Sequence, residues 1–186
     1  MSVSFITKKA LANSLKLLMK ENLISKITVK MVTDTCGVSR HTFYNHFHDV
    51  YDLLEWIFEN EVIDELDECC NLSNWKNGVC LVLRYTLDNK SICINTCKSL
   101  GRELLEVFLQ KTFHKVLIGV IAEITQNMDV DEKIKNQVAT FFAYAITGEF
   151  LHWINSGLIE KKEDIADRIE IMLDGTILRI MTTNKK

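Results

Sequence analysis

The sequence contains no proline and only seven glycines in 186 residues. Because these two residues are the strongest breakers of regular structure, their scarcity favours helices joined by short connections. No run of about 18 apolar residues occurs, so the signature of a membrane-spanning helix is missing. The N-terminal segment has no long apolar run after its basic residues and predicts no secretory signal. We therefore expect a cytoplasmic protein with no membrane partner.

Motifs of catalysis and metal binding are also missing. The sequence has no nucleophile elbow, no phosphate-binding glycine-rich loop, no HExxH motif and no CxxC pair. It therefore predicts no enzyme, no metal site and no cofactor. Its six cysteines can be buried small apolar residues, metal ligands or a redox switch, and burial is favoured because free cysteine is among the most buried residue types. Redox sensing stays open, since thiol reactivity depends on exposure and pKa.

Charge is distributed unevenly along the chain. The net formal charge is −3, but residues 1–48 hold seven basic against two acidic residues, a balance of +5. The other 138 residues hold 15 basic against 23 acidic residues, a balance of −8. A basic front end on an acidic body favours a polyanionic partner for the front end alone, although a chance surface imbalance explains the same numbers.

Apolar residues recur at helical spacing throughout, which predicts an all-α fold of about nine helices and no strand. The expected ranges are 7–22, 29–36, 40–46, 50–70, 74–88, 90–98, 102–126, 131–156 and 162–182. We expect a three-helix head in residues 1–48 and a helical bundle in residues 49–186, which form two domains.

Residues 28–47 carry the strongest local pattern. Thr28 is a candidate N-cap for a short helix that ends at Gly37, and Ser39 is a candidate N-cap for the next helix. Short helix, glycine turn and short helix is the spacing of a helix-turn-helix motif. In the second helix, Phe43 and Phe47 lie on one side as core anchors. The hydrogen-bonding side chains that project elsewhere can reach base edges and phosphates, and they are Arg40, His41, Thr42, Asn45 and His46.

The stretch "ITVKMVTDTCGVSRHTFYNHFHDVYDLLEWIFENEV" resembles the DNA-binding domain of the TetR-type (TetR/AcrR) transcriptional regulators, with a match over residues 7–62. The turn "CGVS" followed by "TFYNHF" carries the resemblance. "FFAYAITGEFLHWINSG" followed by "EDIADRIEIML" resembles the last two helices of that family, whereas residues 70–130 show no motif that matches it. The wording "TFYNHFHDVYDLLEWIFENE" further resembles the branch that includes a regulator of dihydroxyacetone kinase genes.

The resemblance implies a homodimer that binds a palindromic operator in double-stranded DNA. It implies backbone contacts from Tyr44 and His46, and phosphate contacts at the two capping residues Thr28 and Ser39. Arg40, His41, Thr42 and Asn45 then face bases or nearby phosphates, and Lys30 is a further residue that can reach DNA. Family members often carry lysine where this chain has Val50. A phosphate-pairing charge is therefore missing there, although the helix N-terminus can still offer its amides.

Two further sets of residues follow for the body. An unknown small-molecule effector would need aromatic walls with a few polar groups, although core packing explains each of these residues as readily. The candidates are Trp56, Tyr85, Phe108, His114, Phe142 and Tyr144. "VATFFAYAITGEFLHWI" is apolar on most of its circumference, so it needs partners on more than one face. A four-helix interface between two subunits would supply one of these partners. The candidate interface residues are Phe141, Ala145, Gly148, His152 and Met172.

These observations predict an effector-responsive DNA-binding regulator that acts as a homodimer, and most members of the family are repressors. The effector would shift the population of states in which two recognition helices stand about 34 Å apart, one turn of duplex. The alternative is a helical adaptor that kept the fold, lost direct DNA reading and regulates through a protein partner. The missing lysine and the acidic body favour the adaptor, whereas Arg40, Asn45 and the basic head disfavour it.

Overall fold

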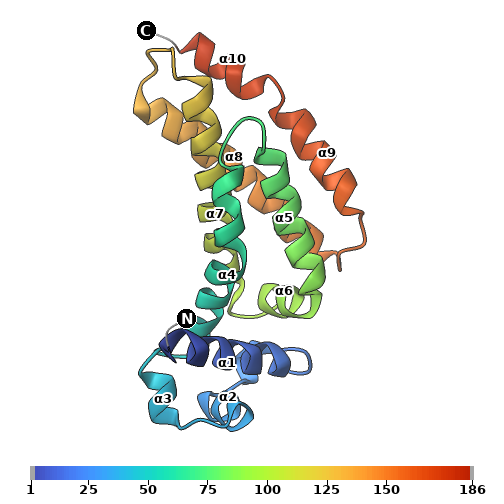
Figure 1. The fold of residues 1–186 in the computed structure, drawn as a ribbon. Coiled ribbons are helices and arrows are strands. Elements are labelled where there is room, and N and C mark those ends of the chain that lie inside the picture. Colours follow the sequence, from blue (N-terminus) through green and yellow to red (C-terminus); the bar gives the residue numbers. More distant parts are fainter. Residues whose placement is uncertain (1–2, 185–186) are drawn as a thin grey trace. The chain divides into compact units, whose positions relative to one another are not determined.

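The regular elements of the protein are helices throughout the part that the structure describes. The structure is a computed structural model that describes residues 3–184, except for the side chains of residues 63–65. Between residues 3 and 184 it holds ten α-helices and two short 3-10 helices, η1 (Ile24–Lys26) and η2 (Asp67–Cys69) (Figure 1). The prediction of an all-α fold is confirmed. No helix in this part of the chain is long and apolar enough to cross a membrane.

The helix boundaries follow the expected ranges closely in most places. The α-helices are α1 (Val3–Leu18), α2 (Val29–Cys36), α3 (Arg40–Tyr44), α4 (Val50–Leu66), α5 (Trp75–Asp88), α6 (Lys90–Cys97), α7 (Arg102–Ile124), α8 (Glu132–Asn155), α9 (Lys162–Leu173) and α10 (Thr176–Thr183).

Three of the expected ranges are wrong, and one of them, 50–70, ends at Leu66. The first helix begins four residues earlier than expected, at Val3, and ends at Leu18 rather than at residue 22. The expected helix over 162–182 is two helices, because Gly175 between α9 and α10 takes a left-handed conformation with φ 64°. A residue with positive φ cannot continue a right-handed helix, so the chain turns there. This break is why the chain has ten α-helices between residues 3 and 184 rather than about nine.

The chain divides into two compact units. Unit 1 is the segment up to Glu61 together with Asn89–Leu105, and unit 2 is Val62–Asp88 together with the segment from Glu106 onward. Helices α4 and α7 each begin in unit 1 and end in unit 2. This division differs from the expected domains 1–48 and 49–186, because α6 and the first part of α4 pack with the head. The expected functional domains stay a prediction.

Unit 1 is built on an apolar core between α1, α2, α3 and the start of α4. Leu11 and Leu15 of α1 and Phe43 of α3 are all 0% exposed. Asn95 of α6 is nearly buried in the same unit, and its amide is satisfied by backbone groups of the α1–η1 connection and of η1. One polar side chain therefore ties α6 to the head.

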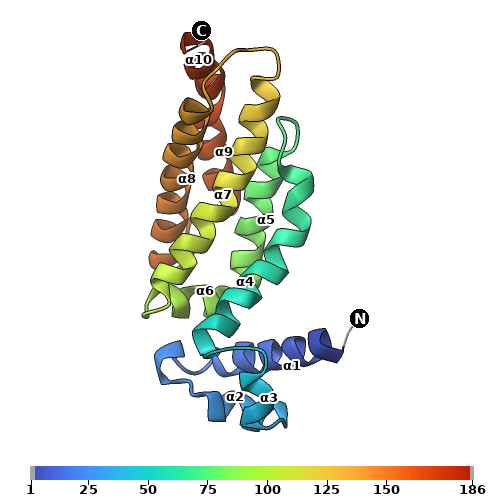
Figure 2. The ribbon, with the colours of Figure 1, turned by 90° about the vertical axis from the view of Figure 1, so that its left-hand side faces the viewer.

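Unit 2 consists of the end of α4, η2, α5, most of α7 and helices α8 to α10. Figures 1 and 2 both show α5, α7, α8 and α9 running alongside one another. Phe113 of α7 and Phe150 of α8 join two of these helices, with ring centroids 4.9 Å apart. Gly119 of α7 allows the backbone of Cys70 to approach closely, since a Cβ at Gly119 would lie 2.1 Å from the Cys70 carbonyl oxygen.

Candidate functional site

The helix-turn-helix segment is fixed by short-range hydrogen bonds. The Thr28 Oγ1 atom accepts a hydrogen bond from the Met31 amide at 3.2 Å and begins α2. Gly37 ends α2 in the left-handed conformation, with φ 74°, and its amide donates to the Thr33 carbonyl oxygen at 2.9 Å. The Ser39 Oγ atom then accepts from the Thr42 amide at 3.1 Å and begins α3. Both predicted N-caps and the predicted glycine turn are confirmed.

Helix α3 and the three residues that follow it have one apolar and one polar side. Phe43 is fully buried and Phe47 is 3% exposed, and their ring centroids lie 5.9 Å apart. The opposite side carries the hydrogen-bonding side chains: Arg40, His41 and Asn45 are exposed, Tyr44 is 58% exposed, and Thr42 and His46 are partly exposed. Hydrogen-bonding groups held on a short anchored helix can enter a major groove. All six side chains are therefore available to a partner.

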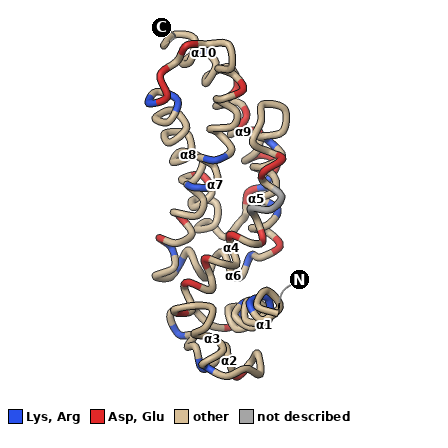
Figure 3. The backbone as a smooth tube through the Cα atoms, turned by 60° about the vertical axis from the view of Figure 1, so that its left-hand side comes forward, with Lys and Arg blue, Asp and Glu red and all other residues tan. Residues whose placement is uncertain are grey.

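The capping residues and Lys30 lie beside this surface in sequence and are also exposed. Lys30 forms a long, exposed ion pair with Asp34, with its Nζ 3.9 Å from a carboxylate oxygen. An exposed pair of this kind contributes little to stability, so the ammonium group remains free to exchange partners. Figure 3 shows basic positions on each of α1, α2 and α3. The charge pattern of the sequence is thus displayed on all three head helices.

The start of α4 departs from what a phosphate-binding helix end requires. Val50 is only 7% exposed, so it belongs to the core of unit 1. The Asp49 carboxylate accepts from the Tyr51 and Asp52 amides at 2.8 and 2.9 Å, and the Asp52 carboxylate accepts from the His48 amide at 2.8 Å. These amides are therefore already satisfied by two carboxylates. The expectation that this helix end still offers its amides to phosphate is disfavoured, because a phosphate would have to displace a like charge.

An apolar stripe lies exposed along α8 and α9 of unit 2. On α8, the exposed residues recur every three or four positions, and they are Phe141, Tyr144, Ala145, Gly148 and His152. Phe141 is 68% exposed, and on α9 the neighbouring Ile171 and Met172 are 72% and 63% exposed. The two helices are tied together by Arg168 of α9, which donates two hydrogen bonds to Glu149 of α8. Large exposed apolar side chains on one face mark an interaction surface.

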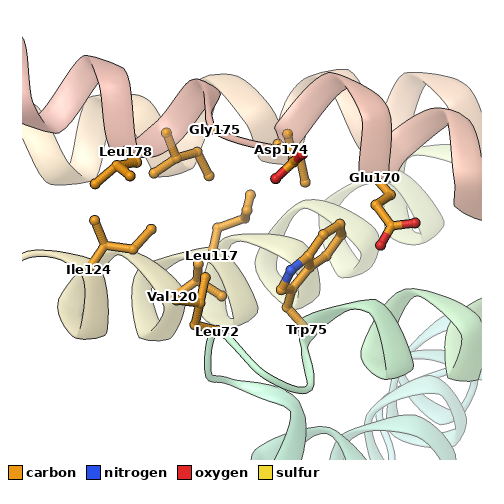
Figure 4. Close-up of a pocket in the computed structure, with 11 residues that line it drawn as sticks. Leu72, Trp75, Leu117, Val120, Ile124, Glu170, Asp174, Gly175 and Leu178 are labelled. Carbon is orange, nitrogen blue, oxygen red and sulfur yellow. The ribbon is translucent and has the colours of Figure 1, made fainter.

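Unit 2 also contains a cavity of about 520 Å³. It lies between the N-terminal end of α5, the C-terminal end of α7 and the junction of α9 with α10 (Figure 4). Its walls are mainly aliphatic, with one indole ring from Trp75 and two carboxylates from Glu170 and Asp174. This volume falls within the range of small-molecule sites.

Comparison with known proteins identifies the chain's relatives. The TetR family model described as "Transcriptional regulator C-terminal region" matches residues 73–175. The chain belongs to the TetR family of transcriptional regulators. A curated relative, the HTH-type dhaKLM operon transcriptional activator DhaS of Lactococcus lactis subsp. lactis (strain IL1403), is 37% identical over 90 residues. That alignment spans 48% of this chain and 48% of the relative, so it covers about half of each.

Solved structures extend the similarity over nearly the whole TetR-family chain. A structure described as dihydroxyacetone kinase operon activator DhaS has a TM-score of 0.72 and 26% identity, and covers 98% of this chain and 99% of that one. A TetR-family regulator from Syntrophomonas wolfei has a TM-score of 0.66 and 14% identity, over 94% of this chain and 96% of that one, and shows the fold alone. The resemblance inferred from sequence, including its branch, is confirmed. The family is one of transcriptional regulators and not of enzymes.

The residues predicted to line an effector pocket are dispersed in this TetR-family chain. Trp56 lies in unit 1, where its ring packs edge-on against Phe47 at 6.0 Å and the Lys8 ammonium lies 5.9 Å from its centroid. His114 hydrogen-bonds Asn136 at 2.9 Å. Phe108 is buried, Tyr85 and Phe142 are partly exposed, and Tyr144 belongs to the exposed stripe. None of the six lines the cavity described above.

Sequence reasoning missed two features of this TetR-family regulator. Asn95 carried no local signal, because its three backbone partners lie 71 to 76 residues away in sequence. The cavity carried none either, because its lining comes from three segments that are distant in the chain, 72–75, 117–124 and 170–178. Trp75 could have been singled out as an aromatic residue near the start of a predicted helix, but nothing in the sequence places it opposite Asp174.

Proposed function

We propose that the protein is a homodimeric, effector-responsive regulator that binds double-stranded DNA through α3. One observation carries the proposal: Phe43 and Phe47 anchor the segment that begins at the Ser39 cap, which leaves its six hydrogen-bonding side chains facing outward. In this proposal Tyr44, His46, Thr28, Ser39 and Lys30 contact the phosphate backbone. Arg40, His41, Thr42 and Asn45 face base edges or nearby phosphates, because long polar side chains on a groove-inserted helix can reach both.

The homodimer is supported by the stripe on α8 and α9. Phe141, Ala145, Gly148, His152 and Met172, the residues predicted for the interface, are all exposed in a single subunit. Two copies that pair through this stripe would bury the aromatic and aliphatic side chains in a four-helix contact. The same contact would hold two heads in a fixed relation, which a palindromic operator requires. An effector would then act by stabilising a state in which the heads no longer match successive major grooves.

The direction of regulation and the target genes are proposals that start from the relatives. Two of them are described as activators, one of the dhaKLM operon and one of a dihydroxyacetone kinase operon. These descriptions favour activation for this chain over the repression that the family at large suggests. They also give a first promoter to test, that of dihydroxyacetone kinase genes. Such a regulator would act in the cytoplasm, where the DNA is.

The adaptor that regulates through a protein partner is the second candidate function. It is favoured by the buried Val50 and by the carboxylates of Asp49 and Asp52, which occupy the helix end where many family members bind phosphate. Each of these features weakens attraction to DNA without removing the surface of α3.

Selection from a pool of random duplexes, followed by sequencing, tests the proposal directly. We would compare the wild type with a Tyr44→Ala, His46→Ala double variant and with Lys161→Ala, which removes an exposed charge in unit 2. Enrichment of one palindrome by the wild type and Lys161→Ala, but not by the double variant, is the expected result. No enrichment even at low salt, where phosphate contacts are strongest, would reject DNA reading and leave the adaptor. A reporter behind the enriched site then distinguishes activation from repression.

A further inference from the structure

Apolar side chains line the cavity in unit 2 on two sides. Helix α7 contributes Leu117, Val120 and Ile124, and the α9–α10 junction contributes Leu173, Ile177 and Leu178. Figure 4 shows Ile124 and Leu178 on opposite sides of the opening, with Leu117 and Val120 on the α7 side. Such walls favour a hydrocarbon group, because burying apolar surface contributes about 25 cal/mol per Å².

The charged side chains that line the cavity are of one sign. Glu170 and Asp174 both line it, and within the described part of the chain no Lys or Arg does. Glu170 is already paired with Lys76 of α5, which also lies 3.2 Å from a carboxylate oxygen of Asp167. The Asp174 carboxylate has no hydrogen bond or ion pair to any residue that the structure describes. Figure 4 shows it at the cavity's edge, on the side of α9, with the Trp75 ring on the side of α5.

Helix ends do not alter this charge balance. Helices α7 and α9 end at the cavity, at Ile124 and Leu173, and bring partial negative charges. Helices α5 and α10 begin beside it, at Trp75 and Thr176, and bring partial positive charges. Because the partial charges of the two kinds of helix end oppose each other, the side chains decide the sign of the charge at the cavity. Lys76 is paired with the carboxylates of Asp167 and Glu170, and Asp174 adds a third carboxylate that Lys76 does not neutralise, so the rim is negative.

An indole ring and an unpaired carboxylate that border one cavity are suited to an organic cation. A cation over an indole face gains roughly 0.5–2 kcal/mol, depending on how far it is desolvated. Among the charged side chains that line the cavity an anion would meet only carboxylates, and the nearby Lys76 is engaged by Asp167 and Glu170. We propose that this cavity binds a small amphipathic cation, with its hydrocarbon part against α7 and α10 and its charged group between Trp75 and Asp174. That this cation is the effector rests on the proposed regulatory function, whereas its binding does not.

The test uses three molecules that share one hydrocarbon cage: adamantylmethylammonium, the neutral adamantylmethanol and the anion adamantanecarboxylate. Binding to the full-length protein without DNA is measured by calorimetry. We expect the wild type to prefer the ammonium over the alcohol by roughly tenfold and to bind the carboxylate weakest. Asp174→Asn should weaken ammonium binding by roughly fivefold and leave alcohol binding unchanged. Trp75→Leu should also reduce the preference for the ammonium.

The matched control is Asp88→Asn, which removes an exposed carboxylate of unit 2 at the other end of α5. It should bind the ammonium as the wild type does, and thermal unfolding should show that all variants are folded. Equal affinity for ammonium and alcohol, equal weakening by Asp88→Asn and Asp174→Asn, or no binding of the ammonium at millimolar concentration would each overturn the proposal.

The two proposals fail separately. An enriched palindrome without ammonium binding would leave the regulator and reject the cation site. Ammonium binding without an enriched palindrome would leave the site and reject DNA reading. If both hold, saturating ammonium should change the affinity for the palindrome at least fivefold, and by reciprocity the palindrome should change the affinity for the ammonium by the same factor. An unchanged DNA affinity would reject the effector role while keeping the site.

Discussion

Asn95 of α6 accepts a hydrogen bond from the Ile24 amide through its Oδ1 atom, at 2.9 Å, across 71 residues of sequence. Its Nδ2 atom donates to the Met19 carbonyl oxygen at 3.1 Å and to the Asn22 carbonyl oxygen. One side-chain amide thereby satisfies three backbone groups where α1 passes into η1. Helix α6 is therefore part of the same compact unit as the head.

Replacing Asn95 should destabilise the protein strongly. Asn95→Leu keeps a similar volume but leaves a buried amide and two carbonyl groups without partners, so we expect a loss of about 3 kcal/mol in the free energy of unfolding. Urea unfolding measures it. Ser91→Ala on the same helix, at an exposed position, should change the free energy of unfolding by less than about 0.5 kcal/mol. Equal stability of the two variants would show that the Asn95 hydrogen bonds are not needed.

The carboxylate at the start of α4 should weaken DNA binding. Asp49→Ser keeps a good N-cap for α4 but removes a negative charge. We therefore expect Asp49→Ser to bind a random duplex roughly threefold more tightly than the wild type at low salt. Fluorescence anisotropy measures this affinity, and Asp88→Ser in unit 2 is the charge-matched control. An unchanged or lower affinity for Asp49→Ser would mean that no phosphate approaches this helix end.

The stripe on α8 should hold two subunits together. Ala145→Arg places a long charged side chain in the middle of the exposed stripe, so we expect the mass in solution to fall from a dimer to the 21.5 kDa of one chain. Sedimentation measures the mass. Ala122→Arg makes the same change at an exposed position of α7 and should stay dimeric. A dimer that survives Ala145→Arg would place the interface elsewhere.

Gly119 should tolerate no side chain. An alanine Cβ there would collide with the Cys70 carbonyl oxygen, which is backbone and cannot rotate away. Gly119→Ala should therefore lower the free energy of unfolding by about 1–3 kcal/mol, despite the better helix propensity of alanine. Gly148→Ala meets nothing within 4 Å and should raise it by about 0.5–1 kcal/mol. Both are measured in the Ala145→Arg background, so that subunit association does not contribute.

The cluster around Arg168 should make stability depend on pH. Hydrogen bonding from Arg168 lowers the pKa of Glu160 below its ordinary value of 4.5. A carboxylate with a depressed pKa in the folded state stabilises that state at higher pH, and the effect is lost as pH falls through the folded pKa. Arg168→Met should therefore be less stable than the wild type at neutral pH. The difference in stability between the two proteins should shrink as pH falls below about 4. The glutamate of the unfolded chain is protonated first, and Glu160 of the folded wild type is protonated at lower pH. Thermal unfolding across pH 3–7 measures it, and a constant difference would exclude the Glu160 pair as its cause.

Local signals in the sequence predicted the helix-turn-helix segment well. Thr28 and Ser39 each cap a helix through an amide three residues ahead, and Gly37 ends a helix through its own backbone conformation. Interactions of such short range depend on residue type and spacing alone. The break at Gly175 was missed for the opposite reason, because a glycine inside a helical pattern is compatible with continuation and with a turn.

The sequence by itself determined that the chain is helical, where α2 begins and ends, where α3 begins, and which side chains α3 presents, because each of these depends on contacts within one or two helical turns. Only the tertiary structure decided that α6 joins the head through Asn95, that Trp56 packs with Phe47 in unit 1, and that Trp75 and Asp174 border one cavity. These relationships join residues that are far apart along the chain. They arise from the packing of whole helices. Hydrophobic periodicity shows which face of a helix is buried, but it does not show which other helix covers that face.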